Sequence, residues 1–114
     1  MADILERRTL KDGETVFREG EPAGSAFIVQ TGEIVITRLI GGVPTELAVI
    51  GQGGVFGEMA LIDDKPRMAT AKVKGGATIV TVTKAMYEQK LKNTDPFVRA
   101  LLRILVDTVR QSSK

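Results

Sequence analysis

The sequence contains no histidine and no cysteine, and each absence removes a class of chemistry. Without cysteine, the chain has no disulfide framework and no thiolate metal site. Without histidine, it has no imidazole general base, no Ser–His nucleophile pair and no histidine-ligated metal. A metalloenzyme on a β-rich scaffold is therefore nearly excluded, and stoichiometric metal in the purified protein would revive it. We expect no metal, no cofactor and no enzymatic activity.

Long apolar runs and a strong excess of one charge are also missing. No stretch approaches the ~20 apolar residues that a membrane-spanning helix needs, and the apolar run near the N-terminus is too short for a secretion signal. Sixteen basic and fourteen acidic residues leave a formal charge of +2, without the basic stripe that nucleic-acid binders usually show. We therefore expect a cytoplasmic protein with no transmembrane segment and no nucleic acid bound by this chain.

Twelve glycines, most of them set between runs rich in Val, Ile and Thr, indicate the fold class. Glycine-containing turns recur about every ten residues up to Gly76, a spacing typical of antiparallel sandwiches and barrels. Asp12-Gly13 reads as a hairpin turn, and Gly75-Gly76 as the turn of a second hairpin. We predict strands at residues 9–11, 15–18, 26–30, 33–40, 45–50, 67–74 and 77–83.

The apolar spacing changes after Thr83 from the period of a strand to that of a helix. A short helix is predicted over residues 84–90, and Asp95 and Pro96 are a good N-cap and first position for a second helix. Its apolar residues recur at three and four, which predicts an amphipathic helix whose stripe packs on the β part. Three of its arginines (Arg99, Arg103 and Arg110) are expected on a solvated face.

These elements together predict one domain over residues 1–114, mainly β with C-terminal helices. The architecture is an antiparallel β-roll or jelly-roll barrel over about 9–83, followed by two helices over about 84–111.

Residues 51–73 carry the densest functional signals, beginning with clustered glycines. Glycine at the start of a short helix frees backbone N–H groups for a phosphate, and Arg67 supplies a planar fork that matches phosphate oxygens. Glu58 would repel a phosphate, so we expect it to accept from a sugar hydroxyl, with Arg67 as a further partner. Asp63, Asp64 and Lys65 are expected in a solvated turn. The pattern fits a compact anion that carries a hydroxyl.

Phe56 to Leu61, followed by Arg67 to Thr70, resembles the phosphate-binding cassette of the cyclic nucleotide-binding domain family, and residues 20–36 resemble its front strands. The family includes regulatory subunits of cAMP-dependent protein kinase and bacterial catabolite-activator-type regulators. The resemblance implies that Glu58 accepts from the ribose 2′-hydroxyl, that Arg67 binds the cyclic phosphate, and that the neighbouring residues supply backbone groups and an apolar wall. The candidate ligand-binding residues are Phe56, Gly57, Glu58, Met59, Ala60, Arg67, Met68 and Ala69.

Met68 is the main departure from the family pattern, which commonly has a small residue there. Members that prefer cGMP often have threonine at this place, whose hydroxyl can reach guanine. Met68 has no hydroxyl and therefore favours cAMP, while cGMP stays open as a ligand. The residue that caps the base is also open, between Arg103 or Arg110 stacking as a cation and a leucine of the helical stripe.

The sequence thus predicts a regulatory sensor domain that binds a cyclic nucleotide, most of all cAMP, and relays binding through its C-terminal helix. A module of another class, which keeps the fold for structure or protein interaction and binds no nucleotide, stays open, and saturable binding would decide. A sensor needs an output, which is left open between a fused effector domain, a separate effector protein and a homodimer.

Overall fold

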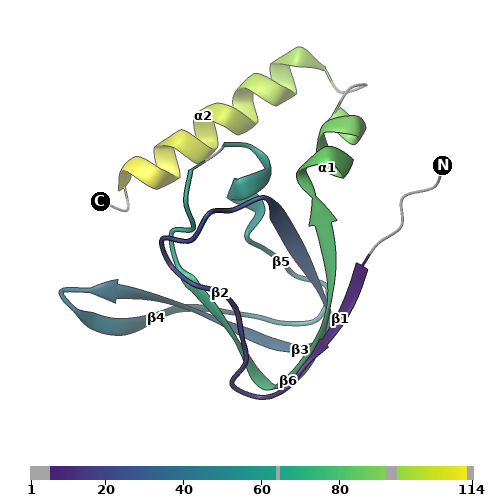
Figure 1. Ribbon diagram of the computed structural model, residues 1–114. Coiled ribbons are helices and arrows are strands. Elements are labelled where there is room, and N and C mark those ends of the chain that lie inside the picture. Colours follow the sequence, from purple (N-terminus) through teal and green to yellow (C-terminus); the bar gives the residue numbers. More distant parts are fainter. Residues whose placement is uncertain (1–5, 64, 92–94, 113–114) are drawn as a thin grey trace.

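The computed structural model describes residues 6–63, 65–91 and 95–112. In them, antiparallel strands come first and two α-helices last, as predicted (Figure 1). The elements are β1 (Glu6–Leu10), β2 (Thr15–Phe17), β3 (Ser25–Ile40), β4 (Val43–Ile50), β5 (Val55–Phe56), a 3₁₀ helix η1 (Glu58–Leu61), β6 (Thr70–Thr83), α1 (Lys84–Leu91) and α2 (Pro96–Ser112).

The strands form one rolled antiparallel sheet. Its main path runs β1-β6-β3-β4, with β2 paired to β6 and β5 paired to β3. Among the described strands, β1 and β4 are the two ends of this path and do not pair with each other, so the sheet is a roll and not a closed barrel. The predicted fold class, mainly antiparallel β with C-terminal helices, is confirmed.

Two long strands replace shorter predicted pieces. The predicted hairpin across Gly75-Gly76 is wrong, because both glycines lie inside β6. Opposite them, β3 pairs Gly32 with Ala77 and then Glu33 with Lys74, so the two glycines are skipped in the register. Their φ angles of 80° and 100° strongly favour glycine, and they bend the strand instead of reversing it. A Cβ on Gly32 would overlap the carbonyl oxygen of Gly76.

The core lies inside the bend of the roll and consists mostly of β-branched and aromatic side chains. Val29, Ile34 and Ile79 are its largest fully buried side chains. Three phenylalanine rings lie beside them, with centroids 5.3 Å apart for Phe27 and Phe56 and 6.0 Å for Phe17 and Phe27. Such offset ring pairs stabilise a core beyond the area they bury. This aromatic cluster becomes the floor of the site described below.

Helix α2 crosses over one end of the roll (Figure 1). It buries little of its apolar stripe. Its N-cap is as predicted, since the N–H of Phe97 donates to Asp95 Oδ1 at 2.8 Å. Val106 is buried, but Phe97 and Leu105 are 71% and 52% exposed. The expectation that the stripe packs on the β part is therefore wrong for most of its length. In the described part of the chain, neither helix is long and apolar enough to cross a membrane.

Candidate functional site

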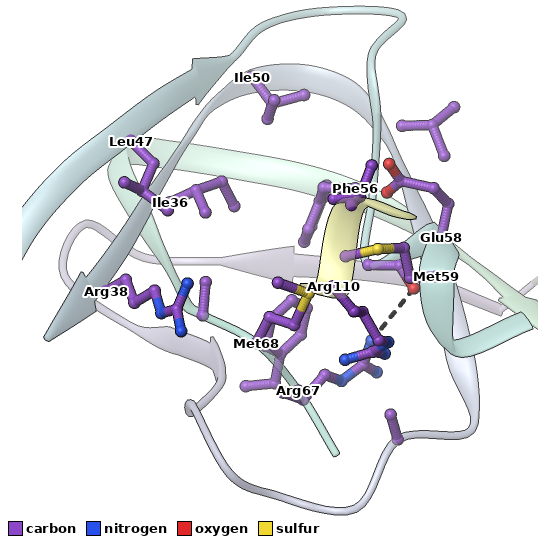
Figure 2. A pocket seen from close by; sticks show the side chains of 16 residues that line it. Ile36, Arg38, Leu47, Ile50, Phe56, Glu58, Met59, Arg67, Met68 and Arg110 are labelled. Carbon is purple, nitrogen blue, oxygen red and sulfur yellow. Dashed lines mark hydrogen bonds between the residues drawn. The ribbon is translucent and has the colours of Figure 1, made fainter. Parts of the chain in front are cut away.

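A cavity of about 270 Å³ opens between the roll, the 3₁₀ helix and the end of α2 (Figure 2). Its walls come from β3, β4, β5, η1, the segment before β6 and the last turns of α2. Seven of the eight predicted site residues line it, namely Phe56, Gly57, Glu58, Met59, Arg67, Met68 and Ala69. The eighth, Ala60, belongs to η1, and its side chain lies outside the described part of the structure.

Gly57 forms the turn that brings the cassette against the core. Its φ of 72° lies in the left-handed region, directly before η1. A Cβ at this position would lie 2.8 Å from Arg67 Nη1 and 3.2 Å from Phe17 Cε2. Both the backbone angle and the close approach therefore require glycine. Because η1 is a single 3₁₀ turn, its dipole is small, and the positive potential at this site must come mainly from arginine side chains, among them Arg67.

The Arg67 side chain is buried and held in one position. Nη1 donates to the carbonyl of Gly57 at 3.2 Å, and Nη2 donates to the carbonyl of Ser25 at 2.8 Å. The guanidinium carbon lies 4.0 Å from the centre of the Phe17 ring, a cation–π contact. Its backbone is fixed as well, since Arg67 N donates to Glu21 O at 2.9 Å and Gly20 N donates to Arg67 O at 2.8 Å.

The charge of Arg67 is left without a direct counter-ion. No described carboxylate forms an ion pair with it, and its Nε is buried without a hydrogen-bond partner. Burial lowers the pKa of Arg67, and the charge of Glu21 raises it in part. A buried cation of this kind is costly to the fold unless an anion arrives to compensate it.

Glu58 does not form the expected pair with Arg67. Its side chain is exposed at the cavity wall, while Arg67 has turned toward two carbonyl groups and the Phe17 ring. Figure 2 shows the two side chains on different walls of the cavity. The Glu58 carboxylate is thus left available to accept from a hydroxyl in the cavity.

An ion pair that the sequence did not predict ties α2 to the cassette. Asp63 is only 3% exposed, so its assignment to a solvated turn is wrong. Arg110 donates from Nε and Nη2 to its two carboxylate oxygens, at 2.5 and 2.9 Å, and from Nη1 to the carbonyl of Pro66 at 3.2 Å. Arg110 is therefore not on a solvated face. With Val109 it lines the cavity, whereas Arg103 does not.

The sequence model of the cyclic nucleotide-binding domain matches residues 7–94. The chain belongs to this family. The match ends before α2 and includes the whole cassette and the described strands, apart from Glu6 at the start of β1.

Relatives of this cyclic nucleotide-binding domain are larger proteins. It is 31% identical over 91 residues to the cAMP-dependent protein kinase regulatory subunit of Mucor circinelloides f. lusitanicus, covering 80% of this chain and 21% of that subunit. The EAL enzyme Bd1971, solved in cAMP-bound and cGMP-bound forms, is similar in structure with a TM-score of 0.86 at 27% identity, and the match covers 94–95% of this chain and 29% of that one. The catabolite activator protein of Thermus thermophilus has a TM-score of 0.77 at 25% identity, with coverages of 95% and 51%.

Sequence reasoning missed the cavity wall that β3 and β4 supply to this domain. Ile36 and Arg38 come from β3, and Leu47 and Ile50 from β4. The register pairs Ile36 with Ala48 and Thr37 with Glu46, which leaves Leu47 as the extra residue of a β-bulge. A bulge changes which side chains face the cavity, and no residue type in this part of the sequence predicts it.

Proposed function

We propose that this domain binds a cyclic purine nucleotide in the cavity beside α2 and prefers cAMP. The observation that carries the proposal is the buried, uncompensated guanidinium of Arg67 with its unpartnered Nε. A cyclic phosphate placed there would neutralise the charge and accept the free N–H. Hydrogen bonds to charged groups are the stronger kind, each contributing about 1.5–3 kcal/mol. The similarity to Bd1971, solved with cAMP and with cGMP, supports the same class of ligand.

The remaining candidate residues fit the rest of such a ligand. Glu58 would accept from the ribose 2′-hydroxyl, and Gly57 would let the backbone approach the phosphate. The other five candidates would supply an apolar wall for the ligand. They are Phe56, Met59, Ala60, Met68 and Ala69. The preference for cAMP rests on Met68, which offers no hydroxyl to guanine. The ligand would leave unchanged, because the chain has no histidine base.

We further propose that binding is relayed through α2. The bidentate ion pair between Asp63 and Arg110 connects the segment after η1 to the end of the helix. Binding of a phosphate that displaces the cassette would therefore change how α2 docks. Such a change is a shift between two packed arrangements of the helix. Residues 1–114 would then act as one sensing domain in the cytoplasm. Its output would be a fused or separate effector, in keeping with the protein kinase subunits among its relatives, or a homodimer.

Calorimetry with four nucleotides tests the binding proposal. We expect saturable one-to-one binding of cAMP, weaker binding of cGMP, and much weaker binding of linear AMP, whose open phosphate carries a different charge and shape. The 2′-deoxy analogue of cAMP should also bind less tightly, because Glu58 loses its hydroxyl partner. The absence of saturable heat with every cyclic nucleotide would overturn the proposal in favour of a module that keeps the fold without binding.

A further inference from the structure

Three arginines line the cavity, and one of them has no role in the site described so far. Arg67 is held by two carbonyls and the Phe17 ring, and Arg110 is held by Asp63. Among the residues that the structure describes, Arg38 has only Glu19 as a charged partner, with Nε 3.9 Å from Oε2, and its side chain is 26% exposed. At that distance the two groups do not form a hydrogen bond, so the donors of Arg38 are available to a ligand.

Arg38 lies on the wall where a purine would sit. Figure 2 places Arg38, Ile36 and Leu47 on one side of the cavity and Glu58 on the other. The phosphate of the proposed ligand would lie against Arg67, and its ribose against Glu58. The base is then left with the apolar side formed by Ile36 and Leu47, where Arg38 provides the charged group.

We infer that Arg38 donates hydrogen bonds to the edge of the purine base and thereby maintains the affinity of this domain for cGMP. This inference rests on the proposed function. The guanidinium only donates hydrogen bonds. Guanine offers it two adjacent acceptors, O6 and N7, whereas adenine offers N7 beside an amino group that is itself a donor. Arg38 therefore acts against the cAMP preference that Met68 gives, and the net discrimination between the two nucleotides is narrow.

A purely structural role for Arg38 makes a different prediction. Glu19 also accepts from the N–H of Leu39 at 3.1 Å, so Arg38 could serve only to brace this loop against β3. In that case, removing Arg38 would weaken every cyclic nucleotide equally. The same result is expected if Arg38 only attracts the phosphate through its charge, since all these ligands carry the same phosphate.

The test is a set of calorimetric titrations with cAMP, cGMP and cIMP. The last has the O6 and N7 of guanine without its 2-amino group, so it isolates the edge that Arg38 would read. We expect Arg38→Met to weaken cGMP and cIMP about tenfold and to change cAMP less than about twofold. Arg38→Lys keeps the charge and loses the planar fork. Because a lysine can still donate to O6 and N7, this variant should weaken cGMP and cIMP less than Arg38→Met does. Glu19→Gln keeps an oxygen for the Leu39 N–H and releases Arg38, so cGMP affinity should be retained or increased.

The outcomes separate the inference from the proposed function. If the wild type binds both nucleotides and neither Arg38 variant changes the ratio of their dissociation constants, the inference is wrong and the proposed function stands. If the wild type binds no cyclic nucleotide, both are wrong. Thermal unfolding of each variant, with Arg38→Lys as the milder change, shows that a lost affinity does not come from a lost fold.

Discussion

The buried charge of Arg67 destabilises the domain when no ligand is bound. Its guanidinium is buried over Phe17, two of its N–H groups donate to carbonyls, and Nε has no partner. Neutral carbonyl acceptors do not cancel a full charge, which is why burial lowers its pKa. The fold tolerates this arrangement because the backbone of Arg67 is bonded on both sides to Gly20 and Glu21. The site is thus preorganised for an anion.

Replacing Arg67 by alanine should weaken cAMP binding at least about tenfold, because each lost hydrogen bond to a charged group contributes about 1.5–3 kcal/mol. Isothermal titration calorimetry measures the loss. Arg99→Ala is the matched control, since Arg99 is exposed on α2 and lies outside the cavity. Equal affinity of the wild type and Arg67→Ala would show that the cavity does not hold the phosphate at this residue.

A methyl group at Gly57 should be harmful in two ways. Gly57→Ala and the control Gly75→Ala both place alanine at positive φ, 72° and 80°, which costs about 1–2 kcal/mol in each case. Only at Gly57 does the new Cβ press on Arg67 Nη1. Urea unfolding should therefore show at least as large a destabilisation for Gly57→Ala as for Gly75→Ala, because only the Gly57 site adds a close contact, while calorimetry should show a loss of cAMP affinity for Gly57→Ala alone. Similar affinities would mean that Arg67 adjusts without loss.

At the scale of the element, α2 is attached to the domain mainly near its end. Val106 is buried, but Phe97, Ile104 and Leu105 are each more than half exposed. The Asp63–Arg110 fork therefore carries much of the attachment, close to the cavity wall. Its side chains are only 3% and 11% exposed, so it belongs to the class of buried pairs in which losing one partner is expensive.

Arg110→Met should lower the free energy of unfolding by about 3 kcal/mol, because the Asp63 carboxylate would stay buried without a partner. Arg103→Met is the control, on the same helix with an exposed side chain. Urea unfolding gives the free energies, and hydrogen exchange should show faster exchange in α2 for Arg110→Met alone. Coinciding unfolding curves for the two variants would mean that the fork contributes nothing to the attachment.

The elements differ in how far sequence could predict them. Strand type, the cassette and the cap at Asp95 are local signals, and the structure has them. The sequence predicts turns at Gly32 and Gly76, where the structure has long strands with register shifts, because glycine between two β-branched runs indicates either one. Asp63 and Arg110 are too far apart in the sequence for any pattern to join them. Whether the side chains of Arg38 and Leu47 face the cavity depends on a β-bulge in β4, which sequence alone does not reveal.

At the scale of the whole molecule, ligand binding and stability are linked. A ligand that binds only the folded chain, present at 100 times its dissociation constant, adds about 2.7 kcal/mol of stability. For a domain of this size, we expect cAMP at that concentration to raise Tm by about 10 °C. Thermal unfolding followed by circular dichroism measures the shift. Arg67→Ala at the same cAMP concentration should show a much smaller shift, and an equal shift would indicate binding elsewhere.

The long pairing of β3 with β6 has a consequence for how this chain folds. The two strands pair from Ser25 with Thr83 to Thr37 with Thr70, so the sheet joins residues that are far apart in the sequence. Loop closure has to occur before these contacts give any gain, and folds dominated by such pairing reach the native state in milliseconds to seconds, not microseconds. We therefore expect α2 to dock late in folding, after the rolled sheet has formed the surface where Asp63 pairs with Arg110.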